Sequence, residues 1–178
     1  MSILLECDDW SGLLIADMQF FTDFDRDGFT YDLTVALDKR GKSEIIYDFD
    51  TNKPWSTVWQ QETKKLVDSI NKGEYSLVLL PPDDFNLFIT NSGASQGDVQ
   101  ITHNIRVSSG EIGFLEAGRA IETFCADEPI ELAYTTSIPN GIYSVTYNIF
   151  RDTKNIEVTI QPAAGQAKSI DSLQNPFQ

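Results

Sequence analysis

Apolar and polar residues alternate along most of this chain, which is the period of half-buried β-strands. The clearest run is VQITHNIRV, where Val99, Ile101, His103, Ile105 and Val107 share one face. Comparable runs are LLIADMQFF (13–21), FTYDLTVAL (29–37), SEIIYDF (43–49), EYSLVLL (74–80), NLFIT (86–90), RAIETF (119–124), IELAYT (130–135), IYSVTYNIF (142–150) and IEVTI (156–160). EIGFLEAG (111–118) fits either a short strand or a helical turn. Turn residues recur about every 8–12 residues, a spacing that is typical of antiparallel sandwiches and barrels.

One stretch, at about residues 53–72, has a helical period instead. Asn52 suits the N-cap, Pro54 the first turn and Gly73 the C-terminal end. The apolar stripe of this helix consists of Trp55, Val58, Trp59, Leu66 and Ile70. Two tryptophans four residues apart suit either a seam that faces the core or a binding platform.

These patterns predict a mainly β domain over residues 1–161. We expect an antiparallel β-sandwich, or a flattened barrel, of about ten strands with one inserted amphipathic helix. A chain of 178 residues with 41% hydrophobic content can bury such a core. Residues 162–178 have no period and are predicted to form a flexible tail.

The stretch DFDRDG resembles the opening of a calcium loop. Asp23, Asp25 and Asp27 alternate as EF-hand ligands do, and Gly28 occupies the turn position. The template fails further on, because position 12 is Thr34 instead of a bidentate Glu, and because a predicted strand replaces the exiting helix. We interpret the stretch as a solvated hairpin connection without a bound metal.

Net charge is the most pronounced feature of the composition. The chain has 27 acidic and 13 basic residues, a net charge of −14, and a pI near 4.2. Such a surface repels nucleic acids and anionic lipids and attracts basic proteins. The residues expected to bind a basic partner are Asp23, Asp25, Asp27, Asp32, Asp83 and Asp84. Solubility alone is the alternative explanation of the charge.

The N-terminal stretch MSILLECDDW lacks the basic and long apolar regions of a signal peptide. No apolar run approaches the ~18 residues that cross a bilayer. Cys7 and Cys125 are too few for a disulfide scaffold, and reduced thiols are expected. These observations predict a cytoplasmic protein.

Few residues suggest a reaction. His103 is the only histidine and lies on the apolar face of its predicted strand, so we expect a neutral structural ring. One histidine and two distant cysteines do not make a zinc site, and the nucleophile-elbow, phosphate-loop and dinucleotide motifs do not occur. Paired carboxylates, as in glycosidases, are the remaining enzymatic alternative. No catalytic residue, metal or cofactor is predicted.

Two segments resemble parts of the bacterial competence protein J family. They are ADMQFFTDF (16–24), where an aromatic-ending strand leads into an acidic loop, and IPNGIYSVTY (138–147), which opens a late strand. Members of that family are small acidic inhibitors of a DNA-entry nuclease, and immunity proteins of toxin systems are similar in size and acidity. The resemblance implies an acidic binder and identifies no binding residue.

We therefore expect a non-enzymatic, acidic protein-binding module, an immunity or inhibitor protein that docks on a basic enzyme such as a nuclease. Two alternatives remain open: a structural or assembly protein, such as a phage component or accessory subunit, and a small-molecule-binding β-barrel. An interior cleft would favour the small-molecule binder, whereas an acidic face with exposed aromatic residues would favour the inhibitor.

Overall fold

The computed structural model describes residues 2–7, 11–22, 26–38, 43, 46–49, 51–90, 96–119 and 130–177, with backbone alone at residues 26 and 27. Its elements are β1 (Ser2–Cys7), β2 (Ser11–Asp17), α1 (Met18–Thr22), α2 (Arg26–Leu37), α3 (Trp55–Lys72), β3 (Tyr75–Leu80), β4 (Asp83–Thr90), β5 (Val99–Val107), β6 (Glu111–Glu116), β7 (Tyr134–Ser137), β8 (Gly141–Phe150) and β9 (Asn155–Pro162). A helical turn at residues 117–119 follows β6. The described chain is mainly β, as predicted, but it has more helix than the single one expected.

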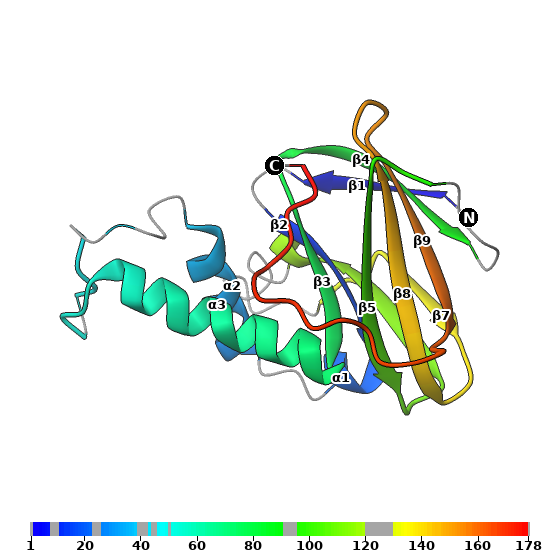
Figure 1. The fold of residues 1–178 in the computed structure, drawn as a ribbon, viewed down its shortest axis with the longest axis horizontal. Helices are drawn as coiled ribbons and strands as arrows, with labels where there is room; N and C mark the ends of the chain where they lie inside the picture. The colour runs from blue at the N-terminus through cyan, green and yellow to red at the C-terminus, as the bar shows by residue number, and fades with distance from the viewer. Residues whose placement is uncertain are drawn as a thin grey trace.

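The strands form two sheets, with the orders β1-β4-β9-β8-β5 and β3-β2-β6-β7 (Figure 1). Paired strands run antiparallel except β4 and β9, which are parallel. Neither sheet closes into a barrel. The register sets His103 of β5 opposite Val145 of β8, so the alternating apolar residues of both strands face the same core.

Two apolar cores lie on opposite sides of the four-stranded sheet. β2 contributes to both: Leu13 and Ile15 join the core between the sheets, whereas Leu14 and Ala16 join a second core under the helices. All seven residues of β2 are buried. Because both faces of β2 are covered, none of its positions faces solvent, where a polar residue would alternate with an apolar one. This explains the continuous apolar run LLIA.

The predicted strand at residues 29–37 is wrong, because these residues lie in helix α2. Phe29 and Leu33 are both buried in the second core, while Tyr31 between them is half exposed. Residues four apart share a helix face, so the alternation Phe29, Tyr31, Leu33 satisfies both periods. Packing of α2 against α3 and the second core decides between them.

The predicted hairpin at residues 13–37 is wrong for the same reason, since β2 ends at Asp17 and α1 begins at Met18. The Asp17 carboxylate accepts the N–H of Gln19 at 2.8 Å, and also those of Ser108 and Ser109 from the turn before β6. Burial alone would raise the pKa of Asp17, but the backbone donors hold it below its usual value. Asp17 thus ends the strand and fixes the β5–β6 turn.

The predicted helix at 53–72 is confirmed as α3, and Gly73 ends it in a left-handed conformation at φ 75°. Its start differs, because Pro54 occupies the N-cap position without a side-chain cap, and Asn52 has φ 51°. The strand predicted at 43–49 does not form over its described residues. Only Tyr47 pairs, in an isolated bridge with Pro54.

The later strands agree better with the sequence pattern. β5 spans the whole VQITHNIRV run, β8 and β9 cover the last two runs, IYSVTYNIF and IEVTI, and EIGFLEAG forms both a strand and a helical turn. β4 begins at Asp83, within the predicted PPDD stop. Of IELAYT, only Tyr134 and Thr135 join a strand. Apart from Arg119, the RAIETF run lies outside the described residues.

Residues 163–177 form neither helix nor strand, which agrees with their lack of a period. They nevertheless run back across the body of the molecule, and their backbone hydrogen-bonds to α3 and β3 (Figure 1). Phe177 packs on Phe85 with the ring centroids 4.9 Å apart. These contacts hold the segment that the sequence predicts to be a flexible tail.

Candidate functional site

A buried hydrogen-bond chain surrounds the only histidine. Ser76 Oγ lies 2.6 Å from the Tyr147 hydroxyl and 2.8 Å from His103 Nδ1, and His103 Nε2 lies 3.2 Å from Gln174 Oε1. Because a carbonyl oxygen only accepts, His103 Nε2 must donate to Gln174, and Nδ1 must then accept from Ser76. Tyr147 donates in turn to Ser76. The chain is satisfied from end to end with a neutral ring.

This network is structural in its geometry. His103 is 2% exposed in the middle of β5, as predicted. Burial lowers the pKa of His103 to about 4, although the Gln174 contact raises it slightly. Burial likewise raises the pKa of the Tyr147 hydroxyl, and Ser76 is fully buried. Ser76 and His103 thus have the spacing of a nucleophile and its base, but both side chains are buried.

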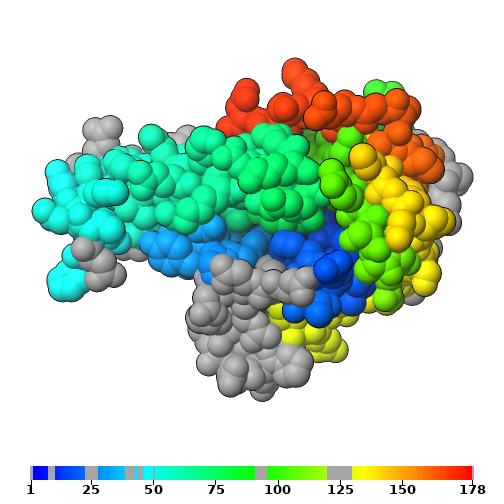
Figure 2. Space-filling model, turned by 90° about the horizontal axis from the view of Figure 1, so that it is seen from below, coloured from blue at the N-terminus to red at the C-terminus, as the bar shows by residue number. Residues whose placement is uncertain are grey.

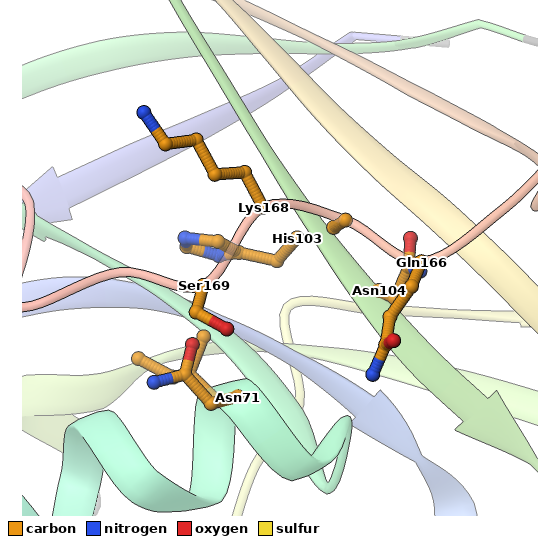
Figure 3. A pocket seen from close by; sticks show the side chains of 8 residues that line it. Asn71, His103, Asn104, Gln166, Lys168 and Ser169 are labelled. Carbon is orange, nitrogen blue, oxygen red and sulfur yellow. The ribbon is translucent and has the colours of Figure 1, made fainter.

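A void of about 30 Å³ lies above His103, between α3, β5 and the C-terminal segment (Figure 3). Asn71, Asn104 and Lys168 contribute to its lining. This volume suits one water molecule and not a substrate. A second cavity, of about 210 Å³, lies beside β1 and is lined partly by Glu6, Glu116 and Arg119. Both are smaller than the ~300–1,000 Å³ of typical small-molecule sites.

Chemistry through a metal finds no support among the described residues. No group of three His, Cys, Asp or Glu side chains in the described ranges is arranged to hold an ion. Cys7 is buried between the sheets, and Cys125 lies outside the described ranges. None of the helices in the described chain is both long and apolar enough to cross a membrane.

The structure separates the acidic residues that the sequence proposes as a binding set. Asp23 and Asp25 lie outside the described residues, and of Asp27 only the backbone, in α2, is described. Asp83 and Asp84 open β4, on a different side of the molecule from α2 (Figure 1). Lys154 lies 2.6 Å from Asp83 and lowers the pKa of that carboxyl. Asp84 is exposed and stands opposite Glu6 of β1.

Asp32 lies between the two long helices, where it is 9% exposed. The strand prediction placed it on a solvent face, so its burial follows from α2 being a helix. Lys65 Nζ lies 3.3 Å from Asp32 Oδ1 and also contacts Glu62. Burial, and then the hydrogen bond to Glu62, raise the pKa of Asp32 to about 7. Burial alone would raise the pKa of Glu62, but the Asp32 and Lys65 hydrogen bonds lower it, so Asp32 is the carboxyl of the pair that protonates first as the pH falls.

Three exposed aromatic residues lie near this cluster, and we name them the aromatic surface: Tyr31 (50% exposed), Tyr47 (58%) and Phe49 (99%). Tyr31 belongs to α2, and the other two to the α2–α3 connection, at the end of the molecule farthest from the five-stranded sheet (Figure 1). Asp48 lies between Tyr47 and Phe49 in the chain. Burial first, and then the Glu62 and Asp48 carboxylates, raise the pKa of Tyr31, so acidic groups border this surface.

Sequence reasoning missed the aromatic surface because it assigned all three residues to the buried faces of strands. A signal was present in the composition of the connection. YDFDTN, from Tyr47 to Asn52, combines aromatic residues with turn-forming Asp and Asn, and this combination suits an exposed loop better than a strand.

Comparison with known proteins identifies no family. No family model matches the chain, and no curated protein matches it. A solved structure described as "Crocagin biosynthetic gene J" aligns over 90% of this chain and 95% of its own, at 13% identity and a TM-score of 0.45. A likeness of that degree carries no functional argument. The resemblance to competence protein J stays a prediction.

Proposed function

We propose that this chain is a non-enzymatic β-sandwich module that binds a basic protein, in the manner of a stoichiometric inhibitor or immunity protein. The observation that carries the proposal is the aromatic surface, where Phe49 is almost fully exposed beside acidic groups. Exposed aromatic side chains are uncommon on a surface without a partner and are frequent anchors in interfaces. Tyrosine faces next to carboxylates suit the arginine and lysine side chains of a basic protein.

The distribution of charge supports different roles for residues 26–72 and for the rest of the chain. Residues 26–72, which include both long helices, contain eight acidic and eight basic residues. The entire net charge of −14 therefore belongs to residues 1–25 and 73–178. A strongly acidic body accelerates the encounter with a basic partner, while aromatic anchors on a neutral projection supply affinity at short range.

The test compares three immobilised baits in the native host's lysate: the wild-type chain, Tyr47→Ser/Phe49→Ser, and the control Leu4→Ser/Ile142→Ser. The control removes two half-exposed hydrophobic residues from the sheets, Leu4 at 55% and Ile142 at 54%, which are close to the 58% of Tyr47. We expect one basic protein on the wild-type and control baits and its loss from the aromatic-surface bait. All three baits should unfold at similar temperatures, because exposed substitutions cost within about 0.5 kcal/mol.

The captured protein is then purified, and its affinity is measured by calorimetry. The aromatic-surface variant should bind at least about tenfold more weakly, since an interface anchor contributes ~1–2 kcal/mol or more. Association should also slow as salt rises. If the captured protein is acidic, or if it binds the aromatic-surface variant as tightly as the control, the proposal is wrong.

A further inference from the structure

The C-terminal segment occupies the seam between the two sheets. β3 and β5 are edge strands of different sheets, and α3 flanks both. Residues 163–177, which we name the C-terminal strap, leave β9, cross β5, pass the end of α3 and follow β3 (Figure 1). In Figure 2 the same segment runs along one rim of the molecule, above the helices. The strap therefore covers the place where two exposed sheet edges meet.

Most of the polar contacts reach the backbone of the strap. The Asn71 side chain binds both backbone groups of Ile170. Its Oδ1 accepts the N–H of Ile170 at 2.9 Å, and its Nδ2 donates to the carbonyl of Ile170 at 3.0 Å. Three further donors meet carbonyl oxygens of the strap: Asn104 Nδ2 at Gly165 (2.9 Å), the Leu79 N–H at Gln174 (2.9 Å) and Arg151 Nε at Pro176 (2.7 Å). Contacts to the main chain are independent of which side chain the bound residue carries.

Three apolar side chains anchor the strap. Ile170 and Leu173 pack against the core under the helices, and Phe177 packs against the core between the sheets. The three anchors are spaced i, i+3 and i+7 along a non-helical segment that bends at residues 171 and 172. Most of the other strap residues are exposed, and a void of about 30 Å³, room for one water molecule, lies beside the strap above His103 (Figure 3). A terminal segment with mostly exposed residues and exposed hydrogen bonds is among the first parts of a fold to open.

We propose that the seam between β3 and β5 is a groove for a non-helical segment of another protein, and that the strap occupies it in cis. The groove takes a non-helical segment with three apolar side chains spaced as Ile170, Leu173 and Phe177, and with a side-chain acceptor for His103 Nε2 at the position of Gln174. The partner displaces the strap instead of docking over it. This site is separate from the aromatic surface and does not depend on it.

A free peptide must compete for the groove with the strap, which is tethered to the same chain. A tethered segment acts at about millimolar concentration, so a free peptide binds the wild-type chain only weakly. A full-length release variant, Ile170→Asp/Leu173→Asp, weakens the strap in cis and leaves the groove side chains intact. The probe is a fluorescein-labelled peptide with the sequence of residues 163–178, AAGQAKSIDSLQNPFQ. Fluorescence anisotropy reports its binding.

We expect saturable binding to the release variant, at least about tenfold tighter than to the wild-type chain, because cis competition is removed. Asn71→Ala added to the release variant should weaken the peptide several-fold. A second peptide, which keeps the three anchors, Gln174 and Pro176 and has alanine or serine elsewhere, should bind within about threefold of the first, since the remaining contacts are to the backbone. A third peptide, with both isoleucine and leucine anchors replaced by aspartate, should not bind.

Three results overturn the proposal. The first is a folded release variant, checked by circular dichroism, that does not bind the 163–178 peptide. The second is that the release variant binds the 163–178 peptide but not the second peptide, because the groove would then fit only its own strap. The third is a concentration-dependent dimer of the release variant or wild-type chain without peptide binding, which assigns the groove to a second copy. Should the release variant fail to fold, the wild-type chain must bind the peptide at millimolar concentration, and absence of that binding also overturns the proposal.

Discussion

At the scale of single residues, burial shifts the pKa values of His103 and Asp32 in opposite directions. His103 is kept neutral by burial and by a hydrogen-bond chain that needs Nδ1 as an acceptor. Burial and the neighbouring Glu62 raise the pKa of Asp32 to about 7, so this carboxyl takes up a proton near neutral pH. Both arrangements are internal to the fold, so their measurable consequence is a dependence of stability on pH.

For His103 we predict a loss of stability in acid. Its pKa is lowered from 6.5 to about 4, so the unfolded chain binds a proton that the folded chain rejects between these values. The free energy of unfolding should be at its full value above pH 6.5 and decrease by roughly 3 kcal/mol on approaching pH 4. Urea unfolding of the wild-type chain and of His103→Gln, at pH 7.5 and pH 5, measures the difference.

The His103→Gln variant should lose part of this pH dependence, because glutamine has no proton to gain. It should also be less stable at pH 7.5 by about 1–3 kcal/mol, since the chain through Ser76 is disturbed. Equal pH dependence in both proteins would contradict the assignment. A variant that folds normally yet loses a chemical activity would overturn the structural role of His103.

For Asp32, the dependence of stability on pH has the opposite sign. Its pKa is raised from 3.8 to about 7, so the folded state holds a proton that the unfolded state releases, and stability is lost as the pH rises through 7. Asp32→Asn keeps a donor toward Glu62 without a proton to lose. Relative to wild type, it should gain about 1 kcal/mol or more of stability between pH 6 and pH 8.5. Asp68→Asn, at an exposed ion pair with Lys64, is the control and should show no such gain.

At the scale of elements, the α2–α3 pair shows how a period can mislead. Phe29, Leu33 and Leu37 repeat at four residues as well as at two, and strong alternation made the strand the simpler interpretation. Had α2 been a strand, Tyr31 would be buried and Asp32 exposed. The helix reverses both, and it thereby creates the aromatic surface and the Asp32 cluster together.

Within α3, we predict a large cost for Leu66 and a smaller one for Trp59. Leu66 is 2% exposed in the core under the helices, so Leu66→Ala should cost about 2–5 kcal/mol in denaturant unfolding. Trp59 is only half-buried, and its indole N–H donates to the carbonyl of Ala36 on α2 at 3.4 Å. Trp59→Ala should therefore cost ~2 kcal/mol.

The same Trp59 variant distinguishes a role in packing between the helices from a role in binding a partner. If its affinity for the captured partner stays at the wild-type value while stability decreases, Trp59 is a packing residue between the helices. If stability is unchanged and affinity is lost, Trp59 extends the aromatic surface instead. A Trp59→Ala cost as large as that of Leu66→Ala would contradict the half-buried placement.

At the scale of the whole molecule, the helices and the two sheets form three layers. The aromatic surface and the seam under the strap are the two places proposed to bind partners. The helices cover one face of the four-stranded sheet, and the five-stranded sheet covers the other, so β2 is buried on both faces. The connection between the helices projects the aromatic surface away from the acidic body (Figure 1). The strap closes the seam between the edge strands, where an uncovered sheet edge would otherwise be open to pairing. The proposed partner and the proposed segment would therefore bind at separate places.

The sequence by itself determined the features that depend on local period and local chain chemistry. The alternation of VQITHNIRV placed His103 on a buried face, and the apolar stripe with Gly73 after it located α3. These elements have one dominant period or a residue that only one conformation suits, so neighbours along the chain suffice to specify them. The mainly β class followed from the same signal repeated along the chain.

The tertiary structure alone decided which elements cover which. Whether residues 29–37 fold as a strand or a helix depended on the second core, because their pattern satisfies both periods. The strap is a stronger case, since it has no period and owes its position to Asn71, Leu79 and other groups far away in the chain. Contacts across such separations depend on the arrangement of layers, which no local pattern records.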